Sequence, residues 1–181
     1  MMTALMICSA LATAPGEASL TKELQAAMEK GRWSDAAELA YRLERLAAAR
    51  APLRIVDLQV LATPPDGLGL YSAPYGGKIG GAEVYLYAQV RNHTLRQVAG
   101  RHQLHLVSDL VVLDAQGKEL ARDEALGESR FAARTAHRDT FVVIALRTRG
   151  LPVGRYQLKL ILHDVLGGKE ASGQALLEIT Q

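Results

Sequence analysis

Apolar and polar residues alternate through most of the chain after residue 51, and a period of two predicts β-strands. The pattern is clearest near the end, where apolar residues recur at every second position: Tyr156, Leu158, Leu160 and Leu162. Because successive side chains of a strand point to opposite faces of a sheet, these residues predict one buried face. Gly167 and Gly168 can adopt the positive φ angles of a tight turn, and the alternation resumes after them. The chain therefore ends in a predicted antiparallel hairpin.

Five earlier segments also have the composition of strands: residues 53–62, 82–92, 102–114, 118–121 and 140–147. In the first, Val56, Leu58 and Val60 are expected to share the buried face. The last, TFVVIALR, is almost entirely apolar, which is typical of a buried strand in the centre of a sheet. Residues 122–138 are charged and weakly patterned, which predicts a loop or a crossing between sheets. Together with the closing hairpin, these segments predict six or seven strands.

Residues 15–51 have a helical pattern instead. Gly31 interrupts this pattern as a helix C-cap glycine would. Asp35 and Glu38 have the D-x-x-E spacing of a capping box, which predicts that a second helix starts there, and Pro52 predicts its end. The run L-x-x-A-x-x-x-G-R-W-x-x-A-A-E-L-A resembles a single tetratricopeptide-like helical hairpin. This resemblance implies a hairpin that packs on the β domain or on a partner, with Trp33 as a candidate anchor for protein contact.

Three residues mark the entry to the closing hairpin. Pro152 and Gly154 predict a turn, and Tyr156 opens the strand that follows. In Greek-key sandwiches, a tyrosine at this place bonds its hydroxyl to the upstream backbone. The run P-x-G-x-Y-x-L-x-L (residues 152–160) resembles the penultimate strand of bacterial Ig-like and fibronectin-III-like domains, and GLGLY (67–71) and AEVYLYAQVRN (82–92) extend the resemblance. It implies a mainly β fold, an antiparallel Ig-like β-sandwich over residues 52–181, and no particular activity.

Tyrosines mark the candidate binding residues. Tyr71 and Tyr75 lie in a segment rich in glycine and proline, residues 63–81, which predicts a long loop. Tyr85 and Tyr87 share the outward face of the strand at 82–92, opposite the apolar set that is expected to face the core: Val84, Leu86, Ala88 and Val90. These tyrosines are candidates for stacking on a sugar or contacting a peptide. The alternatives are that the loop wraps the sandwich with its tyrosines lying on it, and that the strand tyrosines are cross-strand packers.

Charge and composition exclude several kinds of site. The net charge is +2, from 21 basic and 19 acidic residues that are interspersed, so no basic patch indicates a nucleic-acid partner. No segment approaches the roughly 20 apolar residues of a membrane-spanning helix. The single cysteine, Cys8, excludes an internal disulfide and a zinc cluster of cysteines. His102 and His105 are three apart and would point to opposite faces of a strand, so they do not form a strand-borne metal pair. No metal or cofactor is expected, and the alternative is a zinc site assembled across loops.

The first 14 residues are apolar, uncharged and rich in small residues. They resemble the tail of a secretory signal, with A-x-A cleavage sites at residues 10–12 or 12–14. The segment lacks a basic start and is shorter than a complete signal, so it is either a truncated signal or an apolar N-terminus. Cys8 is a candidate for lipidation or a small packed residue. The signal interpretation predicts a periplasmic or secreted protein.

These observations favour a non-catalytic, extracytoplasmic binding or assembly module that contacts a protein or a glycan through its tyrosines. A first alternative is a structural component of a cell-envelope assembly that forms homo-oligomers through a sheet edge or the helices. A second is a hydrolase that uses the acids between residues 123 and 139: Asp123, Glu124, Glu128 and Asp139. Paired carboxylates would do this only if they faced one cleft.

Overall fold

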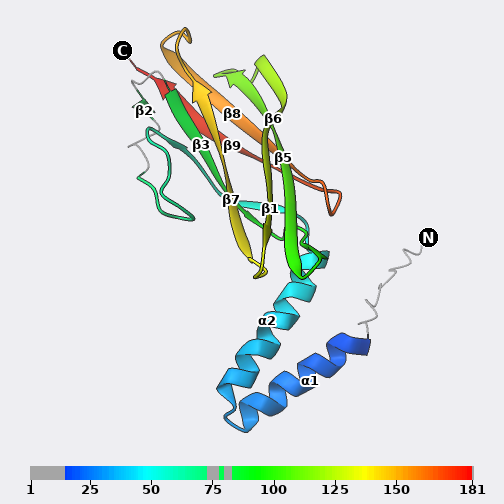
Figure 1. Ribbon diagram of the computed structural model, residues 1–181. Coiled ribbons are helices and arrows are strands. Elements are labelled where there is room, and N and C mark those ends of the chain that lie inside the picture. The colour runs from blue at the N-terminus through cyan, green and yellow to red at the C-terminus, as the bar shows by residue number, and fades with distance from the viewer. Residues whose placement is uncertain (1–14, 73–77, 80–82, 181) are drawn as a thin grey trace, which may run out of the picture. The chain divides into compact units, whose positions relative to one another are not determined.

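The computed structural model describes residues 15–72, 78–79 and 83–180. The chain divides into two compact units, Met1–Ala47 and Ala48–Gln181, and each is described by itself. The first is helical and the second is built of strands, as Figure 1 shows. The structure is mainly β, as the sequence predicts.

Two helices form the helical hairpin, α1 (Pro15–Glu29) and α2 (Trp33–Arg50). Gly31 adopts a φ of 66° between them, which confirms the predicted C-cap. The predicted start of the second helix was two residues late, because α2 begins at Trp33. Asp35 is therefore not the N-cap but lies in the first turn, where its Oδ2 pairs with Arg32 Nη1 at 3.3 Å. The connection between the two helices is short, and the Arg32 N–H within it donates to the carbonyl oxygen of Ala27 in α1.

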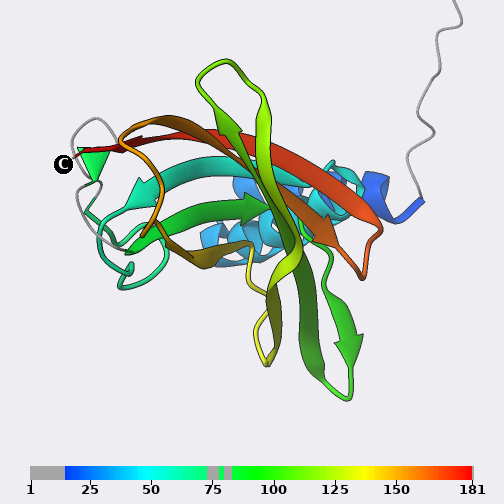
Figure 2. The ribbon, with the colours of Figure 1, turned by 90° about the horizontal axis from the view of Figure 1, so that it is seen from above.

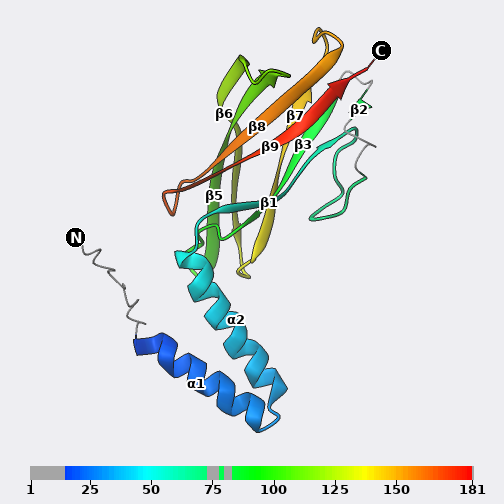
Figure 3. The same ribbon diagram turned by 180° about the vertical axis from the view of Figure 1, so that it is seen from behind.

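The second unit contains nine strands among its described residues: β1 (Arg54–Leu61), β2 (Lys78–Ile79), β3 (Glu83–Arg91), β4 (Arg96–Val98), β5 (Arg101–Asp114), β6 (Glu119–Ala133), β7 (Asp139–Arg147), β8 (Gly154–Asp164) and β9 (Lys169–Ile179). They form a three-stranded sheet in the order β1-β3-β7 and a larger sheet in the order β2-β9-β8-β5-β4, with β6 also paired to β5. The pairs are antiparallel except β2 with β9. Figure 2 shows the two sheets from above, and Figure 3 shows β8 and β9 in front of β3 and β7.

One apolar core lies between the two sheets. The three-stranded sheet contributes the inward row of β3 together with Val142 and Ile144 of β7, and the larger sheet contributes the alternate apolar residues of β5 and β8. The four residues that predicted the buried face of the closing hairpin are all buried in this core. Period-two alternation was therefore a correct guide for both strands of that hairpin and for β3.

Strand β6 corrects the prediction of a loop at residues 122–138. It is 15 residues long, most of its side chains are exposed, and it pairs with β5 along one edge. A bulge also breaks its alternation: Ala125 adopts a φ of 52°, and its N–H donates to Asp109 Oδ1 at 2.8 Å. Charged side chains and an interrupted period together concealed this strand. The loop predicted at 63–81 likewise contains a short strand, β2.

A second bulge corrects the predicted face of β1. The pairing of β1 with β3 shifts between Ile55 and Asp57, and this shift leaves Val56 exposed. Ile55, Leu58 and Val60 contact the core instead. A one-residue bulge moves the residues that precede it to the opposite face.

The predicted tyrosine corner is present. The Tyr156 hydroxyl donates to the carbonyl oxygen of Pro152 at 2.8 Å, and the Tyr156 ring is buried. A Cβ added to Gly154 would lie 3.8 Å from this ring, so the turn runs directly beside it. This hydrogen bond links the β7–β8 connection to the start of β8.

We expect Tyr156→Phe to lower the free energy of unfolding by about 1 kcal/mol, because it removes the hydrogen bond from the Tyr156 hydroxyl to the Pro152 carbonyl oxygen. Urea denaturation measures the loss. Tyr85→Phe is the matched control, since the Tyr85 hydroxyl bonds to Glu83 at an exposed position. Equal, small effects of the two changes would show that the corner contributes no stability.

A buried carboxylate joins the β8–β9 turn to the segment after β3. Asp164 is only 1% exposed, and its Oδ2 accepts the Thr94 N–H at 2.6 Å while its Oδ1 accepts the Gly167 N–H at 3.1 Å. A Cβ on Gly167 would lie 2.0 Å from Thr94 Oγ1 and 2.7 Å from Asp164 Oδ2. Only glycine therefore fits inside this turn.

We expect Gly167→Ala to destabilise the protein by about 2–4 kcal/mol, because the added methyl group must separate Thr94 from Asp164. Gly168→Ala is the control: Gly168 has a φ of 63° and open space around it, so only backbone strain of about 1 kcal/mol is expected there. Thermal unfolding of the two variants makes the comparison. A milder effect at Gly167 than at Gly168 would contradict the packing argument.

Candidate binding site

The candidate site lies on the outer face of the three-stranded sheet, which is the face that the sequence assigns to solvent and to the tyrosine row. Tyr87 corrects this assignment, because its side chain is fully buried. The segment at 66–71 folds over it. The Tyr71 ring lies 4.6 Å from the Tyr87 ring and is tilted by 46°, and the ring of Phe141 on β7 stacks with Tyr87 at 5.6 Å. Tyr71 and Tyr87 are thus brought together, as packing partners.

Backbone hydrogen bonds shape this segment into a small hairpin. The Asp66 N–H donates to the Leu70 carbonyl at 2.8 Å, and the Leu70 N–H donates to the Gly67 carbonyl at 3.1 Å. Gly69 adopts a φ of 67°, a conformation that glycine takes without strain. Its N–H donates to the Tyr87 hydroxyl at 2.9 Å. The hairpin is therefore attached to the sheet by a buried side chain as well as by ring packing.

Asp57 provides a second attachment. Its Oδ2 accepts a hydrogen bond from the Tyr71 hydroxyl, and its Oδ1 accepts one from Gln59 Nε2 at 2.9 Å. Desolvation, followed by the bond to Asp57 and the charge of its carboxylate, raises the pKa of Tyr71 to about 12. The phenol therefore stays protonated and keeps donating across the neutral pH range.

Two leucines on this hairpin remain exposed. Leu68 is 41% exposed and Leu70 is 62% exposed, although the backbone that carries them is attached to the sheet. Val143, beside Tyr87 on β7, is 37% exposed. An apolar surface on a rigid loop is a typical feature of a protein contact.

The other predicted residues have separate positions. Tyr85 shares the outer face of β3, where its hydroxyl donates to Glu83 Oε2 at 2.7 Å, and this bond raises its pKa. Tyr75 lies outside the described residues. Trp33 belongs to the helical unit, as the first residue of α2, and is 66% exposed.

Sequence reasoning missed four residues of this site: Asp57, Leu68, Leu70 and Phe141. The signal for Asp57 was a lone acid inside an apolar strand. Phe141 was assigned to a central buried strand, but β7 is an edge of its sheet, so its outward residues are partly exposed. Only the GLGLY run at 67–71 marked the leucines.

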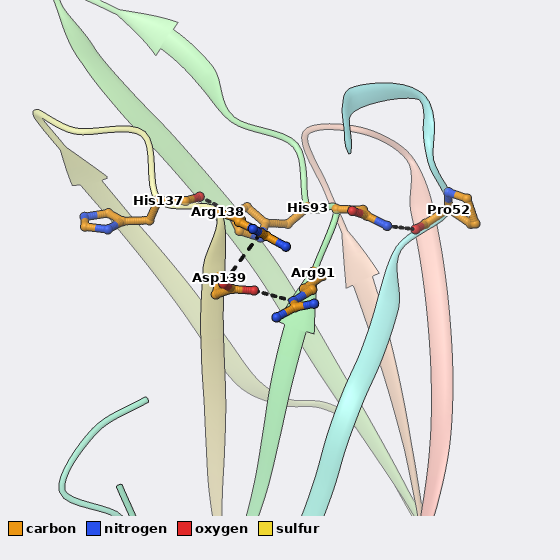
Figure 4. A network of polar contacts seen from close by, with 7 residues as sticks. Pro52, Arg91, His93, His137, Arg138 and Asp139 are labelled. Atoms are coloured by element: carbon orange, nitrogen blue, oxygen red, sulfur yellow. Dashed lines mark hydrogen bonds and ion pairs between the residues drawn. The ribbon is translucent and has the colours of Figure 1, made fainter. Parts of the chain in front are cut away.

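The acids between residues 123 and 139 have different partners on the two sheets. Asp139 Oδ1 accepts Arg91 Nε at 2.6 Å at one end of the three-stranded sheet (Figure 4). Glu128 Oε1 lies 2.8 Å from His105 Nε2 on the larger sheet. Among the described residues, no group of three or more acids, histidines or cysteines could hold a metal ion.

Other polar contacts have structural roles. His93 Nε2 lies 3.1 Å from the carbonyl oxygen of His137 beside the Arg91–Asp139 pair, and burial lowers the pKa of His93 (Figure 4). On the larger sheet, Asp109 Oδ2 lies 2.7 Å from His163 Nε2. The Ala125 N–H and the His163 side chain lower the pKa of Asp109, so this carboxylate is kept ionised.

Titration of Tyr71 tests the attachment of the hairpin. The absorbance difference between the wild type and Tyr71→Phe is expected to titrate with a midpoint at about pH 12, compared with the usual 10.0. Because the folded pKa is the higher one, the stability that Tyr71 contributes is present below pH 10 and is lost as the pH rises toward 12.

Asp57→Asn serves as the matched change in this titration. It should lower the midpoint while leaving it above 10, because desolvation remains. A Tyr71 midpoint near 10 in the folded wild type would contradict the bond to Asp57.

Comparison with known proteins gives little beyond this geometry. No family model and no curated protein matches the chain. It is similar to an alkylpurine DNA glycosylase, AlkC, from Pseudomonas fluorescens, solved bound to DNA containing an abasic site analog, at 12% identity and a TM-score of 0.39, over 96% of this chain and 50% of that one. It is also similar to a putative ApaA protein from Bordetella pertussis, at 9% identity and a TM-score of 0.33, over 71% and 94% of the two chains.

The chain spans about half the length of the glycosylase structure. At TM-scores this low, neither likeness supports a conclusion about activity. In the part of the chain that the structure describes, no helix is long and apolar enough to cross a membrane.

Proposed function

We propose that the protein is a non-catalytic binding or assembly module that contacts another protein through the hairpin at 66–71. The support is one observation: Leu68 and Leu70 are exposed on a backbone that Tyr87 and the Asp57–Tyr71 pair attach to the sheet. A contact surface that is already ordered loses little conformational entropy on binding, so more of its apolar burial contributes to affinity.

We propose an Ig-like sandwich of the fibronectin-III kind as the scaffold. Its support is the order β1-β3-β7 facing β9-β8-β5-β6 and the tyrosine corner at the start of β8. In such scaffolds a rigid core carries binding loops and sheet faces. The extracytoplasmic location remains part of the proposal, and it depends on the apolar segment at 1–14, which lies outside the described residues.

A protein partner is favoured over a glycan. Stacking on a sugar needs a free aromatic face, but Tyr71, Tyr87 and Phe141 pack on one another. Tyr71 and Tyr85 are both half-buried, and their hydroxyl groups are bonded to Asp57 and Glu83, respectively. The two exposed leucines instead match the apolar anchors of protein interfaces.

The test compares two sets of surface leucines. Leu68→Ser with Leu70→Ser should lower capture of a partner from extracts of the protein's own host by about tenfold or more, because both apolar anchors are lost. Leu176→Ser is the matched control, since Leu176 is 71% exposed on the other sheet. Thermal melts should be unchanged in all variants, because the leucines are exposed.

Equal capture by the wild type and the double variant would refute the proposed surface. Binding of the wild type to immobilised glycans that is lost in Tyr85→Ala would support a sugar ligand in its place.

A further inference from the structure

Strand β7 has a free edge that lacks the usual protection. It pairs with β3 over all nine of its residues without a register shift, and no hydrogen bond joins its other edge to another described strand. Between Asp139 and Arg147 there is no charge, proline or glycine, and the residues are mostly β-branched or aromatic. Such an edge is a template for pairing with another strand.

The edges of β6 and β1 carry protective features. β6 has the bulge at Ala125 and charged residues along its length, and β1 has the bulge at Val56. β6 forms no ladder with β7, although a Cβ on Gly127 would lie 3.5 Å from the inward-facing Ile144. The contrast between these strands indicates that the β7 edge is kept available.

We propose that the β7 edge pairs with the β7 edge of a second copy of this chain. The two strands would run antiparallel about a two-fold axis at Val143 and join the three-stranded sheets into one six-stranded sheet. In an interface of this symmetry, each residue contact occurs twice.

Charge complementarity identifies the second copy as the occupant. Pairing about Val143 places Asp139, which also accepts Arg91 Nε of its own chain at 2.6 Å, opposite Arg147 of the other copy at both ends of the strand. Arg147 is exposed and forms no ion pair within the described part of its own chain, so it is available for this contact. All these residues lie on the outer face of the sheet, as their alternation in β7 requires.

Side-chain size is complementary in the same register. On the outer face Phe141 lies opposite Ala145, and Val143, which is 37% exposed in one chain, lies opposite itself. Opposite charges and β-branched residues that face each other stabilise antiparallel pairs, and this register places no like charges opposite each other.

The experiment uses cysteine cross-linking in the full chain with Cys8→Ser. Val143→Cys places two thiols directly opposite each other, where the roughly 4.5–5.5 Å between Cα atoms of an antiparallel pair suits a disulfide. We expect most of the protein to form a disulfide dimer on mild oxidation. Sedimentation of the unmodified wild type should show a concentration-dependent dimer.

Two control variants test the register of the paired strands and the level of random cross-linking. In Ala145→Cys the two thiols would be four residues apart along the strands, about 13 Å, so little dimer is expected. Leu176→Cys reports random collision at an exposed position on the other sheet. The proposal would be overturned if Val143→Cys cross-linked no more than Leu176→Cys. It would also be overturned if Val143→Cys and Ala145→Cys cross-linked equally, because that result indicates parallel strands.

A charge change tests the ends of the strand. Arg147→Glu should weaken the dimer by about tenfold or more, because two pairs of like charges then face each other. Arg149→Glu, which lies beyond the strand, is the control. A dimer that is unaffected by Arg147→Glu would also overturn the proposal. None of these changes alters Leu68 or Leu70, the two residues with which the proposed partner contact is tested.

Discussion

The burial of one apolar core between two sheets is the interaction on which the rest of the structure depends. The chain has a single cysteine, so no internal disulfide assists the core. Because side chains alternate between the two faces of a strand, every second residue of each core strand points into this core. The tyrosine corner and the buried Asp164 then hold the connections in which the alternation stops, at the two ends of β8.

Because the inner faces are used for stability, the contacts that we propose with other molecules involve the outer faces and edges. On the three-stranded sheet, the outer face is partly covered by the chain's own hairpin at 66–71. The Tyr71 ring of this hairpin packs on Tyr87 and its hydroxyl bonds to Asp57, while two leucines of the hairpin remain at the surface. On the same sheet, β7 is the edge without a bulge or a central charge. Stability and contact are thus assigned to different sides of the same strands.

The sequence predicted most of what local pattern determines. The closing hairpin, the inward row of β3, the glycine cap at Gly31 and the bond from Tyr156 were all deduced from spacing or resemblance. Periodicity shows which residues share a face but not what covers that face, so it could not reveal that the hairpin at 66–71 buries Tyr87. Bulges were missed for a related reason, since a register shift at Val56 or Ala125 is decided by the neighbouring strand.

The separation between the anchors of the hairpin and its exposed tip has an evolutionary consequence. Gly69, Tyr71, Tyr87 and Asp57 hold the backbone, whereas Leu68 and Leu70 take no part in that network through their side chains. The tip can therefore mutate while the fold is retained. Descendants of one ancestral gene would be free to acquire new partners through these two codons, with selection preserving the anchors beneath them.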